Sequence, residues 1–151
     1  MQLLEFTQQL TQKQYQNLTI ILNPENNTEI ISKLEKTIKN LKIIDLGKLL
    51  AKKILDGAES KDIEEILADF MDNEKSEFFL ITNSGILFDA SLHLNPVRLF
   101  KKLSVTRKLI VLWHGKRNNN KLTYAQRGHS EYNEYIILKN DARIIDLEEL
   151  N

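Results

Sequence analysis

The stretch NPVRLFKKLSVTRKLIVLW, residues 95–113, places a short helix directly before an apolar strand. Asn95 is a favoured N-cap residue, and Pro96 suits the first helical position because its missing amide proton is not needed there. The helical spacing of apolar residues continues to about Leu103, and residues 109–113 are all apolar. A strand without polar alternation is typical of a parallel sheet that is covered on both faces. This stretch therefore predicts an α/β domain.

The same alternation of helix and strand recurs along the chain. Periodicity predicts helices over residues 2–14, 28–40, 48–55 and 60–71, the first with Leu3, Leu4, Phe6 and Leu10 on one face and the second capped by Thr28. Strands are predicted at residues 18–22, 42–46, 78–82 and 108–113. Residues 118–120 indicate a turn before a hairpin partner at 122–125, and residues 144–147 a last strand or helix start. This order predicts a three-layer domain with a mainly parallel sheet and a C-terminal hairpin.

Composition limits the class of protein. The 151 residues suit a single domain, 1–151, and five glycines and two prolines mark no linker. The chain has no cysteine, which excludes disulfides, thiolate metal sites and a cysteine nucleophile. No apolar run approaches the roughly 20 residues of a membrane span, and the amino terminus lacks a signal-peptide pattern. We therefore expect a cytoplasmic protein with no membrane partner.

Charge is divided unevenly along the chain. Residues 90–130 contain no Asp or Glu, although the overall frequency of 21 acids in 151 residues predicts about six. The segment carries nine cations, which are Arg98, Lys101, Lys102, Arg107, Lys108, Lys116, Arg117, Lys121 and Arg127. If the fold gathers them on one face, they attract a polyanion or an acidic protein. The alternative is that they only solvate the outer faces of helices and strands.

The loop after the first strand decides whether the chain is a nucleotide enzyme, because ligands of α/β folds bind at that edge. A P-loop, GxxxxGK(S/T), needs glycines to hold phosphates, a lysine, and a hydroxyl for Mg²⁺. On that frame Asn23 and Thr28 replace the glycines, Glu29 the lysine and Ile30 the Mg²⁺ ligand. The loop 23–30 is therefore a degenerate P-loop.

The end of the third strand gives the same indication. A nucleotide hydrolase usually carries an Asp there to hold Mg²⁺. This strand ends in Thr82, Asn83 and Ser84. We therefore expect no ATP hydrolysis, no bound cofactor and no metal, and interpret the chain as a protein that is not an enzyme.

Several short motifs resemble one family. They are Leu87, Phe88 and Asp89; Leu94, Asn95 and Pro96; Trp113 and Gly115; Leu122, Thr123, Tyr124 and Ala125; and Gly128, His129, Glu131 and Tyr132. Together they resemble the BrxF family, the small P-loop-type subunit of BREX phage-exclusion systems. The resemblance covers nearly the whole chain, and its carboxyl-terminal motifs are the more specific ones.

The resemblance implies a P-loop-NTPase-like fold. It also implies an antiviral defence subunit that acts on DNA with larger partners, including an ATPase and a DNA methyltransferase. In the family the strand before the first motif ends in Asp-Asn, with a Glu shortly after. Here Thr82 and Asn83 end that strand and Gly85 stands near the Glu position, so the departure falls where nucleotide chemistry is expected.

Aromatic and basic residues follow the fourth strand together. Trp113, His114, Gly115, Lys116 and Arg117 should emerge at the edge that holds the degenerate loop. Lys and Arg there could contact phosphates, while Trp113, Tyr124 or Tyr132 could stack on an unpaired base. The alternative places Trp113 in the core, with Tyr132 and Tyr135 covering the sheet edge.

Two other clusters are weaker candidates. His114, His129 and Glu131 could hold a metal, but they lack an HExxH-type spacing, and a hydrogen-bonded His129 that fixes its loop is the alternative. Asp62, Glu64, Glu65 and Asp69 fit the solvated face of a helix whose apolar side carries Ile63, Ile66, Leu67 and Phe70. These acids could also pair with a second copy of the chain.

These observations lead to one hypothesis and two alternatives. The hypothesis is a non-catalytic subunit of a BREX-type antiphage complex that binds DNA by backbone contacts, helps to assemble the ATPase and methyltransferase, or does both. The alternatives are a pure protein adaptor without DNA contact and a weak nucleotide-binding switch. The predicted contact residues, expected at the loop edge, are Arg98, Lys101, Lys102, Arg107, Lys108, Lys116, Arg117, Lys121, Arg127 and His129.

Overall fold

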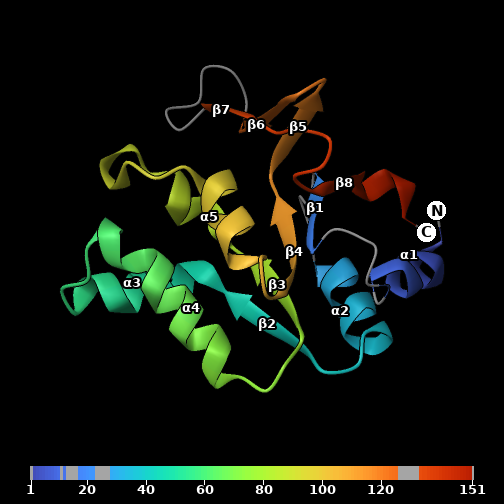
Figure 1. Ribbon diagram of the computed structural model, residues 1–151, viewed down its shortest axis with the longest axis horizontal. Coiled ribbons are helices and arrows are strands. Elements are labelled where there is room, and N and C mark those ends of the chain that lie inside the picture. The colour runs from blue at the N-terminus through green and yellow to red at the C-terminus, as the bar shows by residue number, and fades with distance from the viewer. Residues whose placement is uncertain (1, 11, 13–16, 23–27, 126–132, 151) are drawn as a thin grey trace.

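Five parallel strands form the central sheet of the protein (Figure 1). The structure, a computed structural model, describes residues 2–10, 12, 17–22, 28–125 and 133–150. The strands lie in the order β2-β3-β4-β1-β8, and every neighbouring pair is parallel. Their bounds are β1 Leu18–Leu22, β2 Leu41–Asp45, β3 Phe78–Thr82, β4 Lys108–Trp113 and β8 Arg143–Asp146. The predicted parallel sheet is confirmed, and the segment at 144–147 proves to be its last strand.

Helices cover both faces of this sheet, which makes the domain three-layered (Figure 1). One face packs against α1 (Leu3–Leu10) and α2 (Thr28–Thr37), whose buried Phe6 and Leu34 share a core with Ile21 and Leu80. The other face packs against α3 (Leu46–Leu55), α4 (Ile63–Asn73) and α5 (Pro96–Leu103). All five residues of β1 and of β3 are buried, because each strand is covered on both faces.

The helix that precedes β4 forms as its capping residues predict. The Asn95 side chain accepts a hydrogen bond of 3.1 Å from the Arg98 amide, and Pro96 occupies the first turn of α5. The apolar side of α5 buries Val97, Leu99, Phe100 and Leu103. Arg98, Lys101 and Lys102 remain exposed on its other side.

A second, antiparallel sheet continues directly from β4. Its strands are β5 (Gly115–Asn118), β6 (Lys121–Tyr124) and β7 (Asn133–Ile136), and in Figure 1 they rise above the end of β4. The turn between β5 and β6 consists of Asn119 and Asn120, and Asn119 takes a positive φ of 55°, which asparagine tolerates. The predicted turn and the β6 strand are confirmed. Strands β5 and β7 were not predicted.

Several predicted boundaries are wrong by a few residues. Helix α1 is described only over Leu3–Leu10, and Leu4 is 62% exposed instead of joining the apolar face. Strand β2 ends at Asp45 and not at Leu46, because the Asp45 carboxylate caps α3 by accepting from the Lys48 amide. The helix predicted from Ser60 begins as a 3₁₀ turn at Ser60–Asp62 and continues as α4 to Asn73.

Candidate functional site

The segment 23–30, which we interpret as a degenerate P-loop, leads into α2, and its residues 23–27 are outside the described residues. In the described part, the Glu29 carboxylate lies 2.9 Å from the Lys33 ammonium in the first turns of α2. Ile30 is 6% exposed and belongs to the core beneath α2. An acid and a buried aliphatic side chain therefore stand where a P-loop needs a lysine and a Mg²⁺ ligand.

The polar residues at the end of β3 hold the neighbouring strand and helix together. The Thr82 hydroxyl donates to the Ile44 carbonyl at 3.4 Å, and the Asn83 amide nitrogen donates to the Asp45 carboxylate at 3.0 Å. Asn83 also accepts from the Gly47 amide, and a Cβ at Gly47 would lie 2.4 Å from the Asn83 side chain. Both side chains thus make structural contacts that join β3 to β2 and α3.

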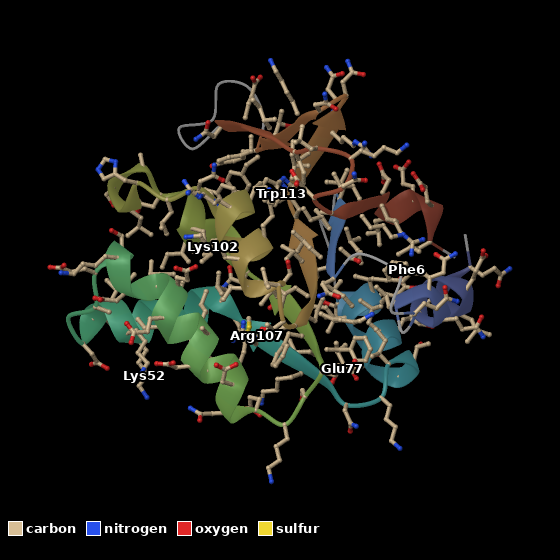
Figure 2. The ribbon with its side chains drawn as sticks, in the orientation of Figure 1. Phe6, Lys52, Glu77, Lys102, Arg107 and Trp113 are labelled. Carbon is tan, nitrogen blue, oxygen red and sulfur yellow. The ribbon has the colours of Figure 1, made fainter. Side chains whose placement is uncertain are left out.

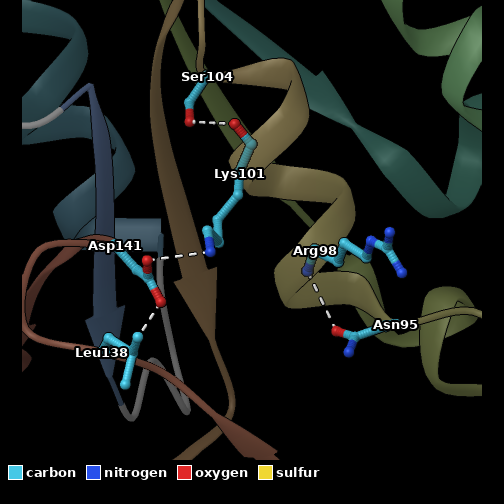
Figure 3. Close-up of polar contacts among 6 residues, drawn as sticks. All are labelled: Asn95, Arg98, Lys101, Ser104, Leu138 and Asp141. Carbon is cyan, nitrogen blue, oxygen red and sulfur yellow. Dashed lines mark hydrogen bonds and ion pairs between the residues drawn. The ribbon is translucent and has the colours of Figure 1, made fainter.

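The cations on and after α5 are largely neutralised by acids from outside the acid-free segment. The Lys101 ammonium lies 3.0 Å from the Asp141 carboxylate (Figure 3). The Lys102 ammonium lies 3.7 Å from the Glu64 carboxylate on α4, and both side chains are about half exposed. A hydrogen bond from the Leu138 amide, followed by the bond from Lys101, holds the pKa of Asp141 below its usual range. The acid-free sequence therefore does not form a single uncompensated basic face.

Arg107 and Lys108 lie at the opposite edge of the sheet from the one predicted. Arg107 donates from Nε and Nη2 to Oδ1 of Asp72, at 3.2 and 2.6 Å, and from Nη1 to the Leu103 carbonyl. Lys108 begins β4, and its ammonium donates to the backbone carbonyls of Leu10 and Gln12. Figure 2 shows Arg107 and Trp113 at the two ends of β4. The prediction that both cations lie at the loop edge is wrong, since they join elements at the amino end of the sheet.

Trp113 is a core residue and has no exposed surface. Its indole Nε1 donates to the Thr123 carbonyl at 2.8 Å, and its ring packs edge-on against Phe88 with centroids 5.0 Å apart. Tyr124 stacks on the other side of this cluster, 3.6 Å from the Phe88 centroid, and Tyr135 is 8% exposed. The interpretation of Trp113 as a core residue is therefore confirmed, and the base-stacking hypothesis is wrong for it. Tyr135 packs in the core instead of covering an edge, and Tyr132 lies outside the described residues.

Gly115 makes the junction between this core and the small sheet possible. A Cβ at this position would lie 1.8 Å from the Thr123 carbonyl oxygen and 2.8 Å from the Trp113 indole nitrogen. Both distances are far below van der Waals contact. The indole bond to Thr123 and the missing side chain at Gly115 together fix the hairpin to the end of β4.

Three exposed cations of the predicted set, Lys116, Arg117 and Lys121, lie on the β5–β6 hairpin. Lys116, Arg117 and every residue onward to Lys121 are exposed. Arg117 donates from Nε to the Asn119 carbonyl at 3.3 Å, while Lys121 lies 3.6 Å from Glu134 of β7. Within the described part of the chain, neither Lys116 nor Arg117 forms an ion pair. The predicted emergence of these cations at the carboxyl edge is confirmed.

The strand register divides these side chains between the two faces of the small sheet. Lys116 pairs with Thr123, and Asn118 pairs with Lys121, so all four side chains point to one face. Arg117 pairs with the buried Leu122 and points to the other face, toward the main sheet. A pocket of about 420 Å³ is lined by Leu22, Lys116, Arg117, Ile144, Asp146, Glu148 and Glu149.

The remaining predicted residues do not join the hairpin. Arg98 lies on α5 and lines a smaller pocket of about 230 Å³ with Lys61, Glu64 and Lys102. Arg127 and His129 lie outside the described residues. In the residues that the structure describes, no three His, Asp or Glu side chains form a group that could hold a metal ion, and no helix could cross a membrane.

Comparison with protein-family models, with curated proteins and with solved structures gives no match for this chain. Function must therefore be argued from the surface itself. Among the predicted contact residues that the structure describes, Lys116 and Arg117 of the β5–β6 hairpin are two adjacent exposed cations without an acid partner.

Proposed function

We propose that this chain is a non-catalytic subunit of a BREX-type antiphage complex and that it contacts DNA through the β5–β6 hairpin. The observation that carries the DNA contact is the exposed run from Lys116 to Lys121, in which Lys116 and Arg117 lack acid partners among the described residues. Cations that are not already paired can replace the counterions of DNA phosphates, which is the main source of sequence-independent affinity. The defence role and the partner ATPase and methyltransferase rest on the resemblance to the BrxF family.

Backbone contact fits the shape of the hairpin better than base reading does. The major groove of DNA admits a two-stranded ribbon. Here β7 pairs along the whole of β6, and Ile136 stands opposite Lys121 beside the turn. A third strand adds about 4.8 Å of width up to the tip, which hinders deep insertion. We therefore expect binding with little sequence preference.

The non-catalytic part of the proposal rests on the two sites that nucleotide chemistry would use. Glu29 is paired with Lys33, Ile30 is buried, and Thr82 and Asn83 bond to neighbouring backbone and side chains. A P-loop-like origin of the fold is supported by the succession of β1, loop and α2, with β1 inside a parallel sheet between β4 and β8. In this proposal the domain keeps the architecture of a P-loop protein and has lost the residues that bind nucleotide phosphates.

A protein adaptor is the second candidate, and one observation favours it. Ile136 is 74% exposed and Leu138 is 57% exposed beside the Lys121–Glu134 pair. Apolar side chains next to cations are more typical of a protein interface than of a phosphate-binding surface. In this second hypothesis the same hairpin binds a partner protein, and the chain has no affinity for DNA.

Fluorescence anisotropy on duplex and single-stranded DNA across a salt series separates the two candidates. The test variant is Lys116→Glu/Arg117→Glu, and the matched control is Lys52→Glu/Lys53→Glu, which makes the same charge change on exposed residues of α3. We expect binding that weakens linearly in log salt, is lost in the test variant and is largely kept in the control. Equal loss in both variants would indicate a net-charge effect only. No binding by the folded wild-type protein at low salt would reject the DNA contact in favour of the adaptor.

A further inference from the structure

Two cations of the hairpin, Lys116 and Arg117, line the same 420 Å³ pocket as a group of carboxylates. Leu22 and Ile144 are the apolar residues of its lining. The carboxylates come from the end of β8 and the turn after it, and we refer to them as the acidic shelf, which consists of Asp146, Glu148 and Glu149.

The acidic shelf is held in place by the fold. Asp146 pairs in register with Leu22 of β1, and its carboxylate accepts a hydrogen bond of 3.1 Å from the Glu148 amide. Leu147 and Leu150 alternate with the acids and pack against the core beneath α1 and α2. The negative charges therefore occupy a fixed position relative to β1 and do not belong to a loose tail.

Asp146 and Glu148 of the shelf lie beyond ion-pair distance of Lys116 and Arg117, unlike the acids that meet other cations of residues 90–130. Lys101, Lys102, Arg107 and Lys121 each come within 4 Å of a carboxylate. In the described residues, no such contact joins Asp146 or Glu148 to Lys116 or Arg117. Lys116 and Arg117 can therefore still bind an anion from outside the chain. That anion would carry the same sign of charge as the carboxylates of the acidic shelf.

We infer that the acidic shelf is a built-in electrostatic brake on polyanion binding at the hairpin. A phosphate held by Lys116 or Arg117 at this pocket would share the pocket with the shelf carboxylates. At physiological salt, charges are screened only over about 8 Å. Repulsion between the phosphate and the carboxylates weakens binding, and a basic partner surface that covers the shelf would relieve it. The inference rests on the proposed DNA contact and adds its regulation by an acid-binding partner.

Removal of two shelf charges tests the inference. In Glu148→Gln/Glu149→Gln the side chains keep their size, and Asp146 keeps its capping hydrogen bond. We expect DNA affinity to rise roughly three- to tenfold at about 50 mM salt, and the gain to vanish near 0.5 M salt because the repulsion is screened. The matched control is Glu35→Gln/Glu65→Gln, which removes the same charge from exposed residues of α2 and α4; its affinity should change much less.

The outcomes separate this inference from the proposed function. If the wild type binds DNA and the shelf variant gains no more than the control, the brake is rejected while the DNA contact stands. A gain that persists unchanged at high salt would also reject it, since the effect would not be electrostatic. If neither the wild type nor the shelf variant binds DNA, both proposals fail. Equal thermal melts of the two variants establish that a change in binding does not come from unfolding.

Discussion

The cations near α5 and the cations on the β5–β6 hairpin come from one acid-free sequence but have different surroundings. Lys101, Lys102 and Arg107 meet acids supplied by α4 and by the segment before β8. Lys116 and Arg117 lie on a hairpin where, among the described residues, only Lys121 forms an ion pair, with Glu134. A stretch rich in Lys and Arg therefore indicates a binding surface only when its ion-pair partners in the fold are known, because acids that are distant in sequence can neutralise its cations.

The largest effect is expected on stability, at the junction between the hairpin and β4. Gly115→Ala places a Cβ 1.8 Å from the Thr123 carbonyl, so the backbone of β5 or β6 must move. We expect a loss of about 2–3 kcal/mol in the free energy of unfolding, measured by urea denaturation. Gly57→Ala is a useful contrast, because its added Cβ meets no atom within 4 Å although the φ of 104° is itself unfavourable. An unchanged stability of Gly115→Ala would show that the hairpin is not fixed by this close approach.

The next prediction concerns a cation that we assign a structural role. Arg107→Gln removes the two bonds to Asp72 and the bond to the Leu103 carbonyl, from a side chain that is only 16% exposed. Denaturation should show a loss of about 1–2 kcal/mol. DNA affinity should stay the same, so a tenfold loss of affinity in a folded Arg107→Gln protein would contradict the division between the two groups of cations.

A smaller effect should appear in the salt dependence of binding. Replacing Lys116 by Gln should lower the slope of log affinity against log salt by about 0.9 on duplex DNA, which is the value for one phosphate contact. Replacing Lys101 by Gln should leave the slope unchanged, because its ammonium is 3.0 Å from Asp141. Anisotropy titrations at four or more salt concentrations measure both slopes. A lower slope for the Lys101 variant, with an unchanged slope for the Lys116 variant, would contradict the difference between the two groups of cations.

The smallest effect is a pH dependence of stability from the Lys101–Asp141 pair. The pKa of Asp141 is lowered from 3.8, first by the Leu138 amide and then by Lys101. Because the pKa of Asp141 is lower in the folded state, its carboxylate stabilises the fold fully at pH values above the pKa of the unfolded state. This stabilisation is lost as the pH falls through the pKa of the folded state. Stability of the wild type should therefore decline below about pH 4 more steeply than that of Asp141→Asn. Urea midpoints from pH 2.5 to 6 measure the difference, and parallel curves would contradict it.

Local patterns predicted the layers of the fold well. The cap at Asn95, the apolar run of β4 and the buried strand Phe78–Thr82 are determined by neighbouring residues, so a single sequence shows them. Strand β7 was missed because only Tyr135 of its four residues is buried, which leaves a short and weak alternation. Strand β5 was missed because Lys, Arg and Asn follow its glycine, and its pairing with β6 is what makes it a strand.

The candidate site was predictable only in part. The predicted position of Lys116 and Arg117 at the carboxyl edge of the sheet is correct, since both residues follow the end of β4 at Trp113. The same prediction failed for Arg107 and Lys108, which precede β4 and so lie at its other end. The acidic shelf could not be predicted from the sequence, because the pairing of β8 with β1 is what brings Asp146 to the pocket that Lys116 and Arg117 also line.

By itself, the sequence determined the alternating helices and strands, the absence of a P-loop motif after the first strand and the uneven distribution of charge. These properties depend on residue type and short spacing. The tertiary structure alone decided which cations are neutralised, that Trp113 packs in the core instead of stacking on a base, and that the acidic shelf lines one pocket with the hairpin cations. The physical reason is that ion pairing and burial act over a few ångströms in space, and strand order brings together residues that are far apart in the chain.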